Sequence, residues 1–561
     1  MLAPISCFAE QINLSVSKPH DPNDNRPINM KTHITYCLLS FCLLGCSGLN
    51  KPQTPPAKVK NIILVIGDGM GPQQVGLLLS YARQAPHSVI TNRITAFDRM
   101  MDQGRLGISL TYTANTLVTD SAASATQLAT GKFAGAEMLG LDVHGNVQEN
   151  IIEKAKRMGK ATGLVSDTRI THATPAAFAA HQTHRGQENS IPEDLLATEA
   201  DVMFSGGLSY WLPQQANETN SSLYNELTQL TANKIDIKSS RNDDKNLLSL
   251  AKSKGYNFIF TKNELQQATG KTLGLFASSM MQNGMLEAQH KNDVNTAQPS
   301  LSDMSTQAIK ILDHNPNGFF LMIEAGQIDT ASHRNDTGLL LHEMLRINDT
   351  LNAVLDWAAT RDDTLVIVTA DHETGGFGFS YSGENIPPPN HLSGTAFSDG
   401  TLFHPKYNFG KPDILDKLYA QKLSYHDIFA KFDELPKAQQ TSLRLTELVS
   451  LYSEFKITEA QANKILTTET NPFYIPDHPS LGEKRVPKIE VNGAFYVYQK
   501  ENRENLLAQA VASSQQVVWA TGTHTSTPVY VFVKGPEQST QPFAKILHHT
   551  ELGQLAIDLL Q

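Results

Sequence analysis

Acidic residues and histidines follow closely after several short apolar runs of this sequence, at the points where buried strands would end. Three of these runs are followed by a carboxylate, at Asp68, Glu324 and Asp371. Asp329, His333 and His372 lie further along after the same runs, and His524 lies ahead of the last predicted strand. Open α/β sheets bind their ligands beyond the carboxyl ends of the strands, so we expect these side chains to meet at one edge of a sheet. Because buried carboxylates are unfavourable unless they are paired or bind a metal, the set predicts bound cations.

The mixture of ligand types indicates which cations these would be. Carboxylates combined with imidazoles favour zinc-like ions, whereas an all-oxygen set favours magnesium. Two close divalent ions can polarise a phosphoryl oxygen, lower the pKa of a nucleophile and stabilise a leaving alkoxide. Each member alone is common in other roles, since an Asp-Gly pair after a strand is usually a turn. The coincidence of several such clusters is what favours a metal centre.

The segment 118–126, with the sequence VTDSAASAT, supplies a candidate nucleophile in Ser121. Its small residues are also typical of an ordinary helix start, with Asp120 or Ser121 as the cap. At a helix N-terminus the backbone N–H groups and the helix dipole favour a bound phosphate. The Ser121 hydroxyl would be a poor nucleophile unless a metal held it as the alkoxide.

The segment 118–126 resembles the nucleophile motif of the alkaline phosphatases along its whole length. The flanking residues follow in the order of that family. The set comprises Asp68, Ser121, His172-Ala173-Thr174-Pro175, Arg185, Glu324, Asp329, His333, Asp371, His372 and His524. The resemblance covers residues 60–380 and 517–555, and it agrees in order, spacing and residue type at every ligand position.

The resemblance implies a role for each of these residues. Ser121 would form a phosphoseryl intermediate, Arg185 would clamp two phosphate oxygens, and Asp120 would orient Arg185. One zinc would be held by Asp329, His333 and His524. A second zinc would be held by Asp68, Asp371 and His372. A magnesium would be held by Asp68, Thr174 and Glu324.

Two positions depart from the family pattern. His172, which we include among the candidate metal ligands, stands where some bacterial members carry Asp. Thr330 stands where others carry a basic or aromatic residue. Both positions bear on metal preference, phosphate release and the pH optimum.

The elements that must position these residues alternate between strand and helix. Apolar runs predict strands at 61–66, 161–165, 202–204, 258–260, 319–323, 365–369 and 529–533. Helical spacing predicts helices at 147–158, at 302–312 with Ser302 as the cap, and at 339–359. Continuous apolar strands suit a parallel sheet covered on both faces. We therefore expect an α/β fold with a doubly wound, mostly parallel central sheet flanked by helices, in a catalytic domain formed by residues 59–380 and 516–561.

Residues 381–515 interrupt this alternation and predict an inserted α+β cap. The segment begins near Pro387-Pro388-Pro389. It predicts short helices at 413–421, 425–435, 441–455 and 458–467. A hairpin is predicted at 489–498, turning at Asn492-Gly493. In the family, an insert at this place forms a crown over the site or at a dimer interface.

The N-terminal region predicts export. Lys31 precedes an apolar run at 34–44 that has the length of a signal-peptide core and is too short to cross a bilayer. The run ends in Leu43-Leu44-Gly45-Cys46, which resembles a bacterial lipobox. We therefore expect a signal peptide at 30–45, lipid attachment at Cys46 and a tether at 46–58. The alternative is a soluble signal peptide with an accidental cysteine.

Further properties bear on location and disulfides. The polar residues 1–29 predict a non-native leader or an upstream mis-start. All four cysteines lie between Cys7 and Cys46, so the body of the chain has no internal disulfide. The expected location is periplasmic or cell-surface, as a lipoprotein anchored to a bacterial membrane.

These predictions together indicate metal-dependent hydrolysis of phosphate monoesters at alkaline pH, with two Zn²⁺-like ions and one Mg²⁺. The alternatives are a phosphodiesterase or sulfatase of the same superfamily and a non-catalytic surface lipoprotein that binds phosphate or metal. Thr174, Glu324 and Arg185 favour monoesters, because those related enzymes generally lack the third-metal set and the arginine clamp. The formal net charge of -10 disfavours nucleic acid as a partner. The family implies a homodimer and inhibition by the product, inorganic phosphate.

Overall fold

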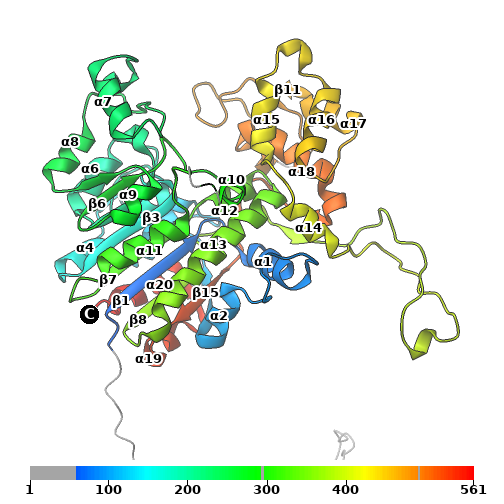
Figure 1. Ribbon diagram of the computed structural model, residues 1–561, viewed down its shortest axis with the longest axis horizontal. Coiled ribbons are helices and arrows are strands. Elements are labelled where there is room, and N and C mark those ends of the chain that lie inside the picture. The colour runs from blue at the N-terminus through cyan, green and yellow to red at the C-terminus, as the bar shows by residue number, and fades with distance from the viewer. Residues whose placement is uncertain (1–57, 292, 294–295, 491–492) are drawn as a thin grey trace, which may run out of the picture. The chain divides into compact units, whose positions relative to one another are not determined.

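A ten-stranded sheet organises the protein, in the order β16-β2-β15-β8-β1-β7-β3-β4-β6-β5 (Figure 1). The computed structural model describes residues 58–561 except 292, 294–295 and 491–492. The predicted leader, the signal peptide at 30–45 and the lipid attachment site Cys46 therefore lie outside the described residues. The strands are β1 (Asn61–Gly67), β2 (Arg105–Leu110), β3 (Ala161–Arg169), β4 (Val202–Gly206), β5 (Asn257–Ile259), β6 (Thr272–Leu275), β7 (Phe319–Ala325), β8 (Thr364–Thr369), β15 (Val529–Lys534) and β16 (Ile546–His548).

The sheet is mostly parallel, as the sequence predicts. Strand β15 runs antiparallel to its neighbours β2 and β8, and the other pairs in the sheet are parallel. Each apolar run that predicted a strand forms one. The strands β2, β6 and β16 were not predicted.

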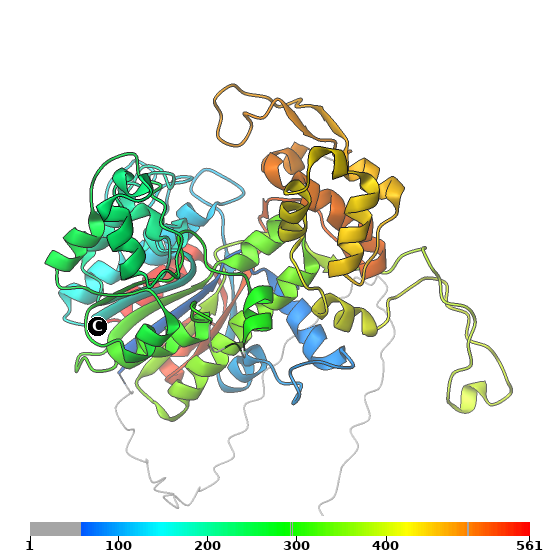
Figure 2. The ribbon, with the colours of Figure 1, turned by 45° about the horizontal axis from the view of Figure 1, so that its top comes forward.

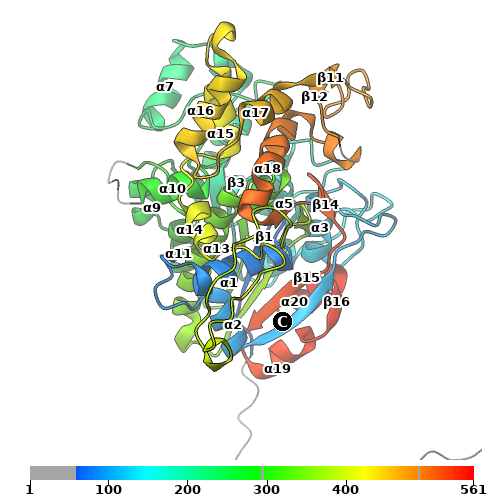
Figure 3. The same cartoon turned by 90° about the vertical axis from the view of Figure 1, so that its right-hand side faces the viewer.

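Helices cover both faces of the sheet. Alternate residues of β1 point to opposite faces, and on each face they pack in a hydrophobic core together with helix residues. Ile63 and Val65 pack in a core with residues of α1 (Pro72–Gln84), α2 (Ala96–Gln103), α11 (Leu301–Leu312) and α13 (Thr337–Trp357). Leu64 and Ile66 pack in a second core with residues of α3 (Ser121–Thr130), α4 (Ile151–Arg157) and α20 (His549–Asp558). Figure 3 shows α11 and α13 on one side of the sheet and α20 on the other. The predicted doubly wound α/β fold is confirmed.

The remaining helices of the body lie between the strands. They are α5 (Ala173–Ala177), α6 (Ile191–Thr198), α7 (Ser222–Leu230), α8 (Leu247–Ser253), α9 (Lys262–Gln267), α10 (Gly284–His290), α12 (Gln327–His333) and α19 (Glu537–Thr540). Within the described ranges, no helix combines the length and the apolar character that crossing a membrane requires.

Capping side chains correct two of the predicted helix starts. Helix α4 begins at Ile151 rather than 147, because Asn150 and Glu153 form a reciprocal capping box. Helix α11 is capped by Ser300 rather than Ser302, since the Ser300 hydroxyl accepts a hydrogen bond from the backbone N–H of Asp303 at 3.0 Å.

The chain leaves the body after β10 (Gly378–Phe379) and returns at β13 (Val517–Val518), and these two strands pair antiparallel. The segment between them holds α14 (Asp413–Tyr419), α15 (Tyr425–Asp433), α16 (Ser442–Tyr452), α17 (Glu459–Leu466), β11 (Thr468–Thr470), β12 (Arg485–Pro487) and α18 (Asn502–Gln515). In Figure 2, α15 to α18, coloured yellow to orange, form one group of helices. The four predicted helices are present with slightly different ends.

The predicted hairpin at 489–498 is wrong in both halves. Residues Ile489 and Glu490 follow the end of β12 and are not in a strand, and residues Gly493–Tyr496 form a short 3-10 helix. The predicted turn residue Asn492 lies outside the described residues. The nearby strand β12 pairs with β11, so that Thr470 lies opposite Arg485.

A buried carboxylate at the start of α13 fastens this insertion to the body. Asp336 accepts hydrogen bonds from the Gln421 side chain at 2.9 Å and from the backbone N–H of Tyr425 at 2.7 Å. It also caps α13 by accepting from the backbone N–H of Leu339. Asp336 therefore couples the position of the insertion to the helix that follows the candidate site.

Candidate active site

The strand pairing brings the predicted side chains to one edge of the sheet. Strand β1 lies between β7 and β8, so that Ile66 is opposite both Glu324 and Thr369. Asp68 and Asp371 follow directly beyond this row, on the same edge as Glu324. Strand β3 pairs with the other side of β7 and leads to His172 and then to α5, which carries Thr174.

Ser121 is the first residue of α3, and all ten residues of this helix are buried. The helix starts here because the Asp120 carboxylate accepts hydrogen bonds from the backbone N–H groups of Ala122 and Ala123. Small side chains let the helix lie against its neighbours without exposing the serine to bulk water. The Ser121 hydroxyl lies 3.2 Å from Nε2 of His372. The nucleophile candidate is therefore in contact with the predicted metal ligands.

Asp68, Asp371 and His372 form the first of three groups whose ligand atoms lie within 4.8 Å of one another. Nε2 of His372 is 3.1 Å from Oδ2 of Asp371 and 3.5 Å from Oδ1 of Asp68. All three residues are fully buried. Oδ1 of Asp68 and Oδ2 of Asp371 have no hydrogen-bond donor. Buried carboxylate oxygens without donors are the environment that a cation would satisfy.

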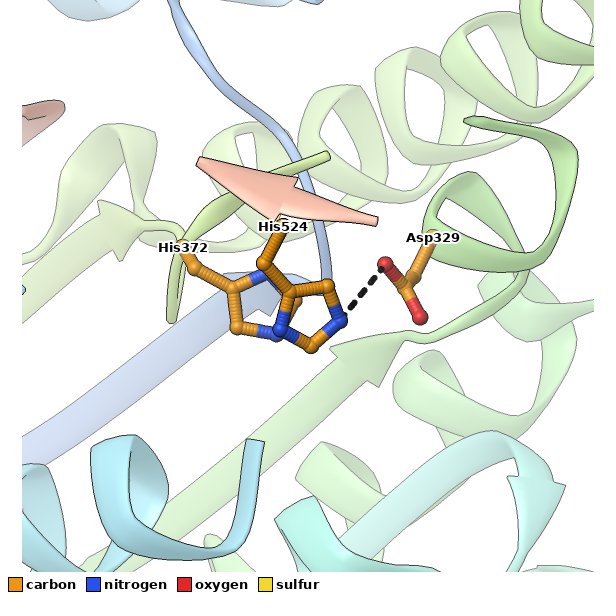
Figure 4. A group of neighbouring side chains, drawn as sticks. All are labelled: Asp329, His372 and His524. Carbon is orange, nitrogen blue, oxygen red and sulfur yellow. Dashed lines mark ion pairs between the residues drawn. The ribbon is translucent and has the colours of Figure 1, made fainter. Parts of the chain in front are cut away.

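The second group contains Asp329, His372 and His524 (Figure 4). The rings of His372 and His524 stack with their centroids 3.5 Å apart, and Nε2 of His524 faces Oδ1 of Asp329 at 3.7 Å. His333, the third predicted ligand here, presents its Nε2 3.0 Å from Oδ2 of Asp329 and 3.1 Å from Nε2 of His524. Asp329 and His333 lie one turn apart on α12, which is why both reach the same place.

The hydrogen bonds behind these two imidazoles leave their inner nitrogens free to bind a metal. Nδ1 of His333 lies 2.8 Å from the carbonyl oxygen of Gly522, and Nδ1 of His524 lies 2.9 Å from that of Thr119. A carbonyl only accepts, so each Nδ1 carries a proton and each Nε2 faces the site. Burial lowers the pKa of His333, but the adjacent Asp329 carboxylate outweighs burial and raises that pKa to about 9, so a cation bound at Nε2 would replace a proton there. The donor set thus fits a zinc-like ion.

Asp68 also belongs to the third group, with His172 and Glu324. One oxygen of Glu324 accepts hydrogen bonds from the hydroxyls of Ser166 and Thr168, whereas the other, Oε1, has no donor and lies 3.6 Å from Nδ1 of His172. The hydroxyl of Thr174 lies 3.5 Å from Oδ2 of Asp68. This group is richer in oxygen than the other two, which suits a hard cation such as magnesium.

The charges of the centre are unbalanced in the protein alone. Burial, followed by the neighbouring carboxylates of Asp371, Asp329 and Glu324, raises the pKa of Asp68 well above its usual value. Burial and the adjacent His372 lower the pKa of His524 to about 3. Bound cations would relieve the repulsion among the carboxylates.

Arg185 lies close to the residue that caps α3 and to His172. Its guanidinium is 3.7 Å from Oδ1 of Asp120 and 3.4 Å from Nε2 of His172. The second oxygen of Asp120 accepts a hydrogen bond from the backbone N–H of Glu137 at 2.7 Å. Because Asp120 is largely occupied by backbone donors, the guanidinium keeps hydrogen-bonding capacity for an anion. It is one-quarter exposed, at 25% of its side-chain surface.

Sequence reasoning missed several residues that contact the site. His549 lies with Nε2 2.8 Å from the carbonyl oxygen of Asp371 and Nδ1 2.7 Å from the Ser109 hydroxyl. Tyr498 and Asn505 come from the insertion and contact His333. Nothing in the local pattern around these residues could have indicated the contacts, because the partners are far away in the sequence.

Comparison with known proteins gives consistent results. The family model described as alkaline phosphatase matches residues 59–556. Alkaline phosphatase 4 of Bacillus subtilis is 33% identical over 424 residues, which are 74% of this chain and 80% of that protein. The crystal structure of Thermus thermophilus alkaline phosphatase superposes with a TM-score of 0.68 at 23% identity, covering 89% of this chain and 91% of that one. That of the cold-active alkaline phosphatase from a psychrophilic Shewanella has a TM-score of 0.63 at 24% identity, covering 89% of this chain and all of that one.

Proposed function

The chain belongs to the alkaline phosphatase family, and from this premise we propose that it hydrolyses phosphate monoesters at alkaline pH through a covalent intermediate on Ser121. The observation that carries the proposal is the position of the Ser121 hydroxyl. It lies at the start of α3 and 3.2 Å from His372, beside buried carboxylate oxygens that have no donor.

Three cations would complete this centre. Asp329, His333 and His524 would hold one zinc-like ion, and Asp68, Asp371 and His372 would hold a second. Asp68, Thr174 and Glu324, with His172 beside them, would hold a magnesium. When bound, such ions neutralise charge on phosphoryl oxygens, lower the pKa of a serine hydroxyl and stabilise a departing alkoxide.

The protein's own groups would bind and orient the phosphoryl group. The backbone N–H groups at the start of α3 favour an anion next to Ser121. The guanidinium of Arg185 would donate to two phosphoryl oxygens. Ser121 Oγ would bond to phosphorus as the bond to the leaving alcohol oxygen breaks, and water would then release phosphate from the serine. Positioning and charge neutralisation of this kind supply most of the catalysis in phosphoryl transfer.

The alternatives differ in what they require of Arg185 and of the oxygen-rich group. A diester or a sulfate ester carries less negative charge than a phosphate monoester, whose second ionisation is complete at alkaline pH, so it attracts a guanidinium less strongly. The presence of Arg185 beside His172, with Thr174 and Glu324, therefore favours monoesters. A surface protein that only binds phosphate or metal would not need a serine hydroxyl directed at the ligand set.

The test is turnover of an aryl phosphate monoester by the chain from Lys51 onward, with an aryl phosphodiester and an aryl sulfate in parallel. We expect strong monoester turnover with zinc and magnesium, loss of turnover with a chelator, and a decrease of several orders of magnitude in Ser121→Ala. Ser302→Ala, on α11 and outside the site, is the matched control and should keep full activity. Faster hydrolysis of the diester or the sulfate would overturn the monoester assignment, and an inactive metal-loaded protein would favour a binding role.

We keep three further predictions as proposals. The N-terminal sequence supports export and a lipid on Cys46, so a labelled fatty acid should be incorporated into the full chain and not into Cys46→Ala. Inorganic phosphate should inhibit competitively as the product. The chain should sediment as a homodimer.

A further inference from the structure

The insertion places one aromatic side chain directly against the candidate metal centre. The ring of Tyr498 packs edge-to-face on the imidazole of His333, with the ring centroids 4.5 Å apart. Tyr498 nevertheless keeps 39% of its surface exposed. Tyr498 therefore contacts a predicted zinc ligand and is still accessible to solvent.

The chain around Tyr498 is attached to the end of α12 at two further points. Glu501, whose backbone N–H donates to the carbonyl of Tyr498 at 2.8 Å, forms an ion pair with Arg334 at 3.4 Å. Asn505 donates to the carbonyl oxygen of His333 at 2.7 Å and to the side chain of Asn335 at 2.9 Å. These contacts fix the ring relative to the ligands that α12 carries.

In-line phosphoryl transfer puts the leaving oxygen on the side of phosphorus opposite the nucleophile. Ser121 contacts His372, and the group formed by Asp329, His333 and His524 would bind the ion beside the leaving oxygen. The organic part of the substrate would then lie next to His333, which the ring of Tyr498 contacts.

We propose that Tyr498 is a specificity-determining residue of this enzyme, contacting the organic group of the phosphate monoester and favouring substrates whose aromatic ring is separated from the ester oxygen by one methylene group. This inference rests on the proposed function. An aromatic ring already held by packing on His333 loses little freedom when a second ring stacks on it, so the aromatic pair adds to the binding of such substrates.

The test compares benzyl phosphate with ethyl phosphate, because the two leaving alcohols have similar acidity and differ mainly in the ring. We expect Tyr498→Ala to lower the benzyl-to-ethyl ratio of kcat/KM by about 2- to 12-fold, through the benzyl substrate alone. Tyr498→Phe should keep the ratio, because it keeps the ring. Tyr474→Ala removes another exposed aromatic residue of the same insertion, and it should leave both substrates unchanged.

Two additional measurements separate this proposal from other effects. The zinc content of each variant shows whether Tyr498 only supports His333. Equal losses of kcat/KM for both substrates together with lost zinc would overturn the proposal. An unchanged benzyl-to-ethyl ratio of kcat/KM in Tyr498→Ala would also overturn it. Binding of benzylphosphonate and ethylphosphonate, which cannot be hydrolysed, is measured in the same variants. A preference for benzylphosphonate that depends on Tyr498 in a protein without turnover would overturn the proposed function and support the contact.

Discussion

Arg346 on α13 is the centre of a buried ion cluster whose loss should destabilise the protein strongly. Its side chain is only 3% exposed and contacts three carboxylates. Its guanidinium is 2.9 Å from Asp167, 3.1 Å from Glu343 and 3.2 Å from Glu287. Burial raises the pKa of Glu343 to about 7, against the opposing charge of Arg346. The cluster therefore depends on its one cation.

The cluster also supports the helix that carries two predicted metal ligands. Asp167, at the end of β3, accepts a hydrogen bond from the backbone N–H of Gly326 at 2.7 Å, where α12 begins. The Gln327 side chain donates to the carbonyl oxygen of Asp167 at 3.0 Å. Arg346 thus acts on Asp329 and His333 indirectly, as a positioning residue.

We expect Arg346→Leu to lower the free energy of unfolding by about 3–5 kcal/mol, which is the usual cost of leaving a buried charge without its partner. Neutralising one carboxylate in addition, in Arg346→Leu with Glu343→Gln, should recover part of that loss. Zinc affinity should fall in the single variant, because the start of α12 is less firmly held.

Urea unfolding of metal-free protein measures the stability of the two single variants and the double variant, and competition with a chelator measures zinc affinity. The control is Arg444→Leu, which removes an exposed ion pair with Glu447 and should change stability by less than about 1 kcal/mol. If Arg346→Leu also costs less than about 1 kcal/mol, or if the two substitutions in the cluster are strictly additive, the reasoning is refuted.

The other predictions concern acid stability, the insertion and glycine packing. Burial lowers the pKa of His342 to about 4 in the folded protein against 6.5 when unfolded, so its contribution is complete above pH 6.5 and is lost as the pH falls towards 4. The free energy of unfolding at pH 7 exceeds that at pH 5 partly through His342, so this excess should be about 2 kcal/mol smaller in His342→Gln than in the wild type. An unchanged excess would contradict the prediction. Asn505→Ala should weaken zinc binding about 10- to 100-fold in a chelator titration, because the carbonyl oxygen of His333 loses its hydrogen-bond donor. If the variant binds zinc as tightly as the wild type, the insertion does not support the site. Gly107→Ala should strongly reduce soluble yield, since an added Cβ would lie 2.0 Å from the backbone oxygen of Phe543. In Gly76→Ala on α1 the added Cβ meets nothing closer than 3.7 Å, so this variant should stabilise the protein by about 0.5–1 kcal/mol. Equal soluble yields of the two variants would refute the packing argument.

The sequence predicted a strand correctly where the residues of that strand alone form a clear apolar pattern. Continuous apolar runs identified the central strands β1, β7 and β8, because a strand buried on both faces has few polar residues. Strand β2, with the sequence RLGISL, was missed because its first two residues are exposed and its glycine weakens the pattern. The strands β16, with the sequence ILH, and β6, with the sequence TLGL, were missed because polar or glycine residues leave no more than two consecutive apolar residues in either strand.

The same distinction applies to the candidate site. Ser121 lies within a specific local motif, and Asp68, Glu324 and Asp371 follow strands that the sequence predicts, so a rule about strand ends was enough to group them. The assignment of His333 and His524 to one metal relied on family resemblance, and the structure adds the carbonyl partners at Nδ1 that leave each Nε2 free.

The sequence by itself determined which residue types are available for chemistry and which predicted strands they follow, because both properties can be read from neighbouring residues. Only the tertiary structure decided that Tyr498 and Asn505 of the insertion contact His333 and that Arg346 pairs with Asp167, 179 positions away. Such pairs form because folding brings distant segments together around a shared core, and side chains that meet in this way impose no periodicity on the sequence around them.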